Sequence, residues 1–253
     1  MNWWGLFTLV KHEVHRTFKV WAQALFPPIV STILFITIFY FVLGRSASAP
    51  GGVSYLEFLV PGLVIMNMVS AAYQGSSFSL FMSRYTKHFE HILTMPISYM
   101  EIVLGVLMGG LARSIITGAG IVAATSFFIP FRVEHVVLLV VYVLLAVFFV
   151  GSLGVLVGFW ADKFDHLGIV VTFVLTPLTM LGGVFYSISN LPASFQKATL
   201  LNPVFYMVDG FRYAILGIHD APIWQGLTVL FILGVAAFTF VVALLRSGWK
   251  VKE

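Results

Sequence analysis

Long apolar runs constrain this chain more than any other feature of its sequence. About twenty apolar residues in a helix cross the hydrocarbon core of a bilayer. Six runs of this kind lie near residues 22–44, 58–83, 102–128, 135–160, 167–187 and 223–245. Only 9% of the 253 residues are charged and 60% are hydrophobic, whereas a soluble domain has about a quarter of its residues charged. The sequence therefore predicts an all-α polytopic membrane protein with six transmembrane helices, forming a single domain over 1–253.

Lysine and arginine are shared unequally between the two sets of connections. An excess of these residues marks the cytoplasmic side of a membrane protein. With the N-terminus inside, nine of them fall on the cytoplasmic side and four outside, while Arg113 lies within the third span. We therefore expect both termini in the cytoplasm. The net charge of +4 is a matter of topology and does not point to a nucleic-acid partner.

The first 21 residues form a different kind of segment. Apolar side chains such as Trp3, Phe7 and Val10 recur at steps of three or four, and charged residues such as Lys11 and Glu13 lie between them. This pattern is typical of an amphipathic helix lying in the membrane interface, with its charges on the opposite face. The alternative, a soluble N-terminal helix, has no soluble body to pack on.

Residues 84–98, RYTKHFEHILTMPIS, form a charged segment between the second and third spans. On a helix, the apolar side chains, among them Tyr85, share one face, and the charges lie largely opposite. Pro96 ends this helix, and Ser98 with Glu101 can begin the next. A tight turn would suffice to join two spans, so we expect a cytoplasmic helix that docks on a soluble partner; a plain amphipathic linker is the alternative. The expected docking residues are Arg84, Lys87, His88, Glu90, His91 and Thr94.

Residues 188–222, on the outer side, are too apolar for a solvated loop and too interrupted to span the bilayer. Two short apolar runs meet at Asn202-Pro203. Non-helical backbone at membrane depth is tolerated only where it is packed in protein. We therefore expect two short re-entrant helices that dip into the outer leaflet, with the bend at Asn202-Pro203.

Several functional classes lack the residues that they need. The chain has no cysteine, which excludes disulfides and thiol catalysis, and no G-x-x-x-x-G-K-[ST] loop for a nucleotide. The histidine pairs at 12 and 15 and at 88 and 91 lack the third ligand and supporting carboxylate of a metal site. We expect no catalytic residue and no metal, and we expect the glycine-rich stretch 151–158 to permit close helix packing.

Arg113 is the one charge expected near the middle of the membrane. An ionisable residue at this depth is a functional hypothesis by default. Two interpretations are open: a structural pairing with Asn67 or Gln74, or a place on a substrate path. These three residues form the predicted buried polar path.

Several of these segments resemble the permease subunits of the ABC type-two exporter family. The outer segment carries the family's Leu-Pro, Asn-Pro and Arg pattern at Leu191, Pro192, Asn202, Pro203 and Arg212. FLVPGLVIMNM looks like the family's second span, and RYTKHFEHILTMPIS falls where the family has its coupling helix. The N-terminal helix matches the family's connecting helix, so the resemblance covers the whole chain.

The resemblance implies a mechanical role for the chain, with no enzyme activity and no cofactor of its own. It implies a permease of the bacterial inner membrane, expected as a homodimer among membrane lipids, that exports an amphiphile such as a lipid, glycan or drug. A separate cytoplasmic ATPase would bind ATP and Mg and move the coupling helix over 84–98. The outer gate would comprise Asn202, Pro203, Asp209 and Arg212. The alternative is an ATP-independent carrier or channel, which the scarcity of charges in the spans disfavours.

Overall fold

The computed structural model describes residues 2–43, 52–127, 129 and 132–248. Within these ranges the chain is helical and contains no strand, which confirms the predicted class. In chain order the helices are α1 (Trp3–Lys19), α2 (Trp21–Leu43), α3 (Tyr55–Tyr85), α4 (His88–Thr94), α5 (Tyr99–Thr125), α6 (Val136–Trp160), α7 (Phe164–Val170), α8 (Thr176–Met180), α9 (Ala193–Leu200), α10 (Pro203–Leu216) and α11 (Ile223–Ser247).

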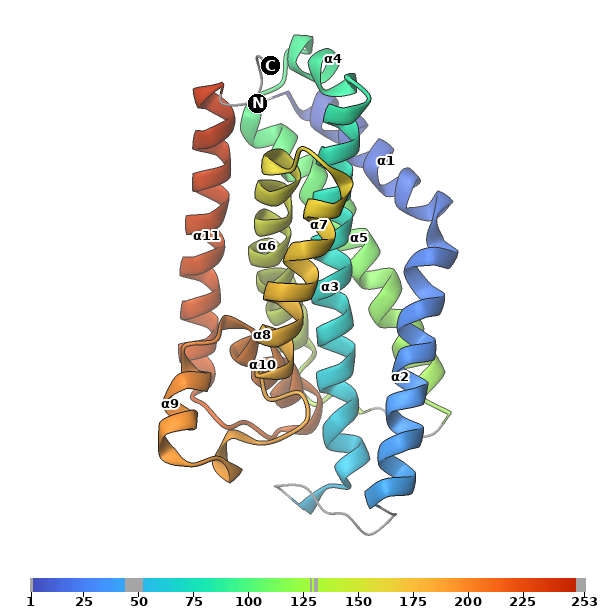
Figure 1. The fold of residues 1–253 in the computed structure, drawn as a ribbon, viewed down its shortest axis with the longest axis vertical. Coiled ribbons are helices and arrows are strands. Elements are labelled where there is room, and N and C mark those ends of the chain that lie inside the picture. The colour runs from blue at the N-terminus through green and yellow to red at the C-terminus, as the bar shows by residue number, and fades with distance from the viewer. Residues whose placement is uncertain (1, 44–51, 128, 130–131, 249–253) are drawn as a thin grey trace.

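Helix α3 lies at the centre of the bundle, and its most extensive contacts are with α6 and α5 (Figure 1). Of its most apolar stretch, 67% is buried inside the protein, against 11% for α2. Helix α2 therefore directs most of its side chains away from the bundle, as a helix that faces lipid or a partner chain does.

Five of the described helices, α2, α3, α5, α6 and α11, are long and apolar enough to cross a membrane. The predicted fifth span, 167–187, is shorter than expected: the helical segment is Phe164–Met180 and has 17 residues. It contains a π-helical turn, Val171–Leu175, placed just before Pro177, which has no N–H and whose ring crowds the preceding turn. The chain then leaves the helix near Gly183, whose positive φ of 76° suits glycine. The predicted end at residue 187 is therefore wrong.

Glycines on α5 and α6 allow the neighbouring helices to pack closely, which was predicted for the stretch 151–158. On α5, Gly109 faces α1, whereas Gly118 faces Met68 of α3. On α6, a Cβ at Gly154 would lie 2.7 Å from the carbonyl oxygen of Tyr73 on α3. Small residues let the helix backbones approach closely where there is no hydrophobic driving force between helices, so these contacts set the spacing of the bundle.

The ends of the bundle carry different elements (Figure 1). The start of α1, the end of α11 and α4 lie at one end, here called the α4 end. The beginning of α3 and helices α9 and α10 lie at the opposite end, here called the α10 end. This places the predicted docking segment and the predicted outer gate at opposite ends of the bundle.

Candidate functional site

The segment predicted as one helix over 84–98 is divided between two helices. Helix α3 continues through Arg84 and Tyr85, and Lys87 takes a left-handed conformation with φ of 57° that redirects the chain into α4. Arg84 donates through Nη1 to the carbonyl oxygens of Phe159 and Ala161 at the end of α6. Helix C-termini leave such carbonyls without intrahelical partners, so α6 holds the last turn of α3 in place. The predicted start at residue 84 is therefore wrong.

Helix α4 has one buried and one exposed side. Phe89 and Ile92 are buried in a cluster that includes Val103 and Phe159. The chain after α4 enters α5 through a capping box of Ser98 and Glu101, as predicted. Five of the six expected docking residues share the exposed surface, called here the α4 surface: Lys87, His88, Glu90, His91 and Thr94. Arg84 is separated from them by its contacts with α6.

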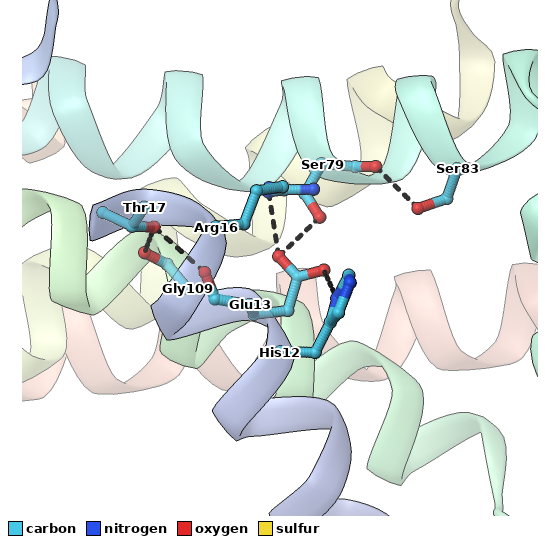
Figure 2. A network of polar contacts seen from close by, with 7 residues as sticks. All are labelled: His12, Glu13, Arg16, Thr17, Ser79, Ser83 and Gly109. Atoms are coloured by element: carbon cyan, nitrogen blue, oxygen red, sulfur yellow. Dashed lines mark hydrogen bonds and ion pairs between the residues drawn. The ribbon is translucent and has the colours of Figure 1, made fainter. Parts of the chain in front are cut away.

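A buried acid on α1, which was not among the predicted site residues, is surrounded by polar side chains of α1 and α3 (Figure 2). Glu13 of α1 is only 3% exposed. Its Oε2 atom accepts a hydrogen bond from Ser79 Oγ of α3 at 2.7 Å and lies 2.8 Å from Arg16 Nη2. Its Oε1 atom lies 4.0 Å from Nδ1 of His12. A buried carboxylate needs such partners, and together they join α1 to α3.

The Glu13 carboxylate can reach α3 because α5 makes room for it. A Cβ on Gly109 would lie 3.0 Å from both Cβ and Oε2 of Glu13. One turn on, Thr17 Oγ1 donates to the carbonyl oxygen of Gly109 at 3.4 Å (Figure 2). Helix α1 therefore rests on α5 through Glu13 and Thr17, while Trp3 and Phe7 point outward with 68% and 62% exposure. The apolar side chains Trp3 and Phe7 are exposed, whereas Glu13, expected with the charges on the opposite face, is instead buried against α5 and α3.

One sequence signal could have singled out Glu13. It is the only acidic residue before Glu57, and it lies four residues before Thr17, on the same face of a helix. The partner Ser79 carries no such signal, because it lies 66 positions away and is one of several serines in its helix. The pairing exists only once α1 folds back across α3 and α5.

Arg113 lies beside Gln74, one of the two partners proposed for it. Its Nη2 atom donates to Oε1 of Gln74 at 3.4 Å. Asn67 instead donates to the carbonyl oxygen of Leu63 and to Thr32 Oγ1. All three residues of the predicted polar path nevertheless line one cavity of about 260 Å³ between α2, α3 and α5.

Asn202 and Pro203 form the start of α10 at the opposite end of the bundle. Asn202 caps the helix by accepting from the Val204 N–H at 3.0 Å, and Pro203 occupies the first turn, where its missing N–H costs nothing. The side-chain amide of Asn202 also donates to the carbonyl oxygen of Leu178 at 2.7 Å. The two helices that meet here, α9 and α10, match the expected short helices and their bend.

Asp209 and Arg212, further along α10, are buried and bonded largely to backbone. Asp209 accepts from the N–H groups of Asp220 and Ala221 at 2.8 and 3.1 Å. Burial raises the pKa of its carboxyl group, and the two N–H donors oppose that rise. Arg212 is 1% exposed, donates to the carbonyl oxygen of Gly183 at 2.8 Å, and lies over the ring of Phe58 at 3.7 Å.

Asp220 also belongs to this cluster at the α10 end, although it was not among the residues predicted from the sequence. Its carboxylate accepts from Ser187 Oγ at 2.5 Å and from the N–H of Ile188 at 3.0 Å. Together with Asp209 and Arg212, Asp220 connects α10 to the segment before α9 and to the segment after α10. The four predicted outer residues are thus brought onto one helix and its cap, and their surroundings are those of a scaffold.

No group of three or more metal-binding side chains occurs among the residues that the structure describes. His12 lies near His88, with ring centroids 6.3 Å apart, and His88 lies 6.4 Å from His91. The first of these ring contacts joins α1 to α4, whereas the second lies within α4.

The described part of the chain combines apolar helices long enough to span a membrane with the partly exposed α4 at one end and the packed pair α9 and α10 at the other. The family model described as "ABC-2 type transporter" matches residues 5–216. The chain therefore belongs to the ABC-2 type transporter family, which confirms the resemblance seen in the sequence.

Named relatives cover almost the whole chain. The inner membrane transport permease YadH of Escherichia coli strain K12 is 37% identical over 248 residues, which are 98% of this chain and 97% of the relative. Nodulation protein J of Rhizobium meliloti strain 1021 is 27% identical and covers 91% of this chain and 90% of its own. The corresponding protein of Rhizobium leguminosarum bv. trifolii is 28% identical, with the same coverage. This similarity supports a transport permease of the inner membrane.

Proposed function

We propose that this chain is the permease half of an ABC exporter, working as a homodimer that a separate cytoplasmic ATPase drives. The α4 end is its cytoplasmic face, with both termini inside, and the α10 end is the outer gate. ATP and Mg are bound by the ATPase, and the exported substrate is an amphiphile of the lipid, glycan or drug class. Membership of the ABC-2 type transporter family supports the pairing with an ATPase.

The observation that carries the proposal is the construction of the α4 surface. Its polar residues Lys87, Glu90 and His91 are exposed, while Phe89 and Ile92 anchor the helix in the bundle. A partner that pushes on α4 would therefore move packed elements and not a free loop. Motion would reach α3 directly through the turn at Lys87, and α6 through the contact between Phe89 and Phe159, whose ring centroids are 6.4 Å apart.

Glu90→Arg tests this role. The charge at an exposed position is reversed, so the fold is retained, and we expect ATPase activity associated with the affinity-purified complex to fall several-fold because docking is weakened. Lys197→Glu, an equal charge reversal on exposed α9 at the opposite end, should leave that activity unchanged. An ATPase rate in Glu90→Arg equal to that of the parent would contradict the proposed docking role of Glu90.

The alternative, an ATP-independent carrier or channel, predicts a different result. Its flux would depend on an ion or proton gradient and would continue in proteoliposomes that hold the permease alone. Transport that requires the ATPase subunit and hydrolysable ATP would exclude it.

A further inference from the structure

A cavity of about 490 Å³ opens between α1, α3, α5 and the segment from α7 into its π-helical turn. It begins near Arg16 and Phe164, toward the α4 end, and reaches Arg113 in the middle of α5. The smaller cavity of about 260 Å³ continues from it, since Gln23, Gln74 and Arg113 line both. Together they form what is called here the arginine cavity.

The arginine cavity carries positive charge without a matching acid in its wall. Arg16 and Arg113 line it, and its described lining includes no aspartate or glutamate. Arg16 is paired with Glu13, whose carboxylate is buried behind the wall. Arg113 has no carboxylate within ion-pair distance among the residues that the structure describes. The charge available inside the cavity is therefore that of Arg113.

Arg113 uses only part of its capacity to donate hydrogen bonds. A guanidinium has five N–H donors, but the hydrogen bonding of Arg113 to described residues consists of one 3.4 Å bond to Gln74. Its Nε atom is buried and has no partner among the described residues. An unpaired charge at this depth in a membrane protein is costly, and an oxyanion that accepts two parallel N–H bonds would satisfy it.

The other part of the cavity wall is apolar. Phe78 of α3 and Phe164 of α7 meet edge to face, with centroids 5.9 Å apart, and are 37% and 60% exposed. Leu167 and Val171 continue this wall along the π-helical segment. A charged pocket beside an apolar wall matches a ligand with an oxyanion at one end and a hydrocarbon chain at the other.

We propose that the arginine cavity binds the oxyanion group of an anionic amphiphile, held by Arg113 with Gln23 and Gln74. Its apolar chain lies along Phe78 and Phe164. The link to transport rests on the proposed function and narrows the substrate class to amphiphiles with a phosphate, sulfate or carboxylate group. Binding itself needs no ATPase, so it can be measured on the purified chain.

The experiment titrates the full chain, in a neutral detergent, with short-chain phosphatidic acid, phosphatidylcholine of the same chain length, and inorganic phosphate. Calorimetry should show phosphatidic acid binding more tightly than phosphatidylcholine. Arg113→Gln should weaken that binding roughly tenfold, the loss expected when a charged hydrogen-bond donor is removed. The affinity of Arg113→Lys for phosphatidic acid should lie between those of the parent and Arg113→Gln, because lysine keeps the charge but not the paired N–H donors of a guanidinium. Arg246→Gln, which removes an exposed arginine at the end of α11, is the matched control.

The arms of the titration distinguish the source of the oxyanion. Tight phosphatidic acid with weak inorganic phosphate indicates a lipid headgroup, whereas equal affinities that Arg113→Gln weakens equally indicate a free oxyanion. Equal affinity of the parent and Arg113→Gln for phosphatidic acid overturns the proposal, as does equal binding of phosphatidylcholine. If Arg113→Gln fails to fold, Arg113→Lys and Gln74→Leu carry the test, and unchanged binding in both overturns it. An ATPase rate in Glu90→Arg equal to that of the parent would instead overturn the proposed docking role and leave this binding result standing.

Discussion

Buried charges hold both ends of the bundle, but their partners differ in kind. At the α10 end, Asp209 and Arg212 are bonded to backbone N–H and carbonyl groups. At the α4 end, Glu13 is bonded to side chains, Arg16 of its own helix and Ser79 of α3. Backbone partners fix the course of a loop, whereas side-chain partners can change rotamer and exchange. We therefore expect a rigid scaffold at the α10 end and a cluster at the α4 end that can rearrange when α4 is moved.

The largest effect is expected at the α10 end. Arg212→Met fills a similar volume but leaves the carbonyl oxygen of Gly183 without its donor and removes the contact with Phe58. We expect a loss of about 3 kcal/mol in stability, because a buried charged hydrogen bond and a packed ring contact disappear together. Thermal unfolding in detergent measures this, with the exposed Arg246→Met as control. A Tm equal to that of the parent would show that the cluster at the α10 end is not a scaffold.

A smaller effect is expected for the inner cluster. Glu13→Gln retains an acceptor for Ser79 but removes the ion pair with Arg16, whose side chain is 30% exposed. We expect a loss of about 1–2 kcal/mol, because partial exposure weakens the pair. The exposed Lys11→Gln on the same helix is the control.

A double-mutant cycle with Ser79→Ala measures the link between α1 and α3. A coupling of about 1 kcal/mol is expected for side chains in direct contact. Because Gln keeps an acceptor for Ser79, the cycle uses Glu13→Ala, and strict additivity of Glu13→Ala and Ser79→Ala would mean that the cluster does not join the two helices.

The smallest effect is expected at the cap of α10. Asn202→Ala removes both the acceptor for Val204 and the donor to Leu178, and a lost N-cap costs about 1 kcal/mol. Asn202→Asp keeps the acceptor and should lose less, so hydrogen exchange in the first turn of α10 should rise in the order parent, Asp variant, Ala variant. Equal exchange in all three would assign the bend to Pro203 alone.

The class of protein and most of the element order could be predicted from the sequence, because the period and length of apolar runs are local properties. The Ser98–Glu101 box and the Asn202-Pro203 cap are local as well. The end of the fifth span could not be predicted, because the sequence remains apolar beyond Met180 although the helix ends there. The start of α4 was missed for a related reason: the carbonyl groups that hold Arg84 belong to α6, 75 positions away.

The sequence by itself determined that this chain crosses a membrane, that it carries an amphipathic helix at its beginning, and that a short charged helix lies between two spans. It did so because a segment buried in lipid must form a long uncharged helix, which leaves few other structures open to it. Only the tertiary structure decided which charges are buried and with what. Glu13 meets Ser79, Arg212 meets the Gly183 carbonyl, and Arg113 faces a cavity, because each of these arrangements brings together segments that are distant in sequence.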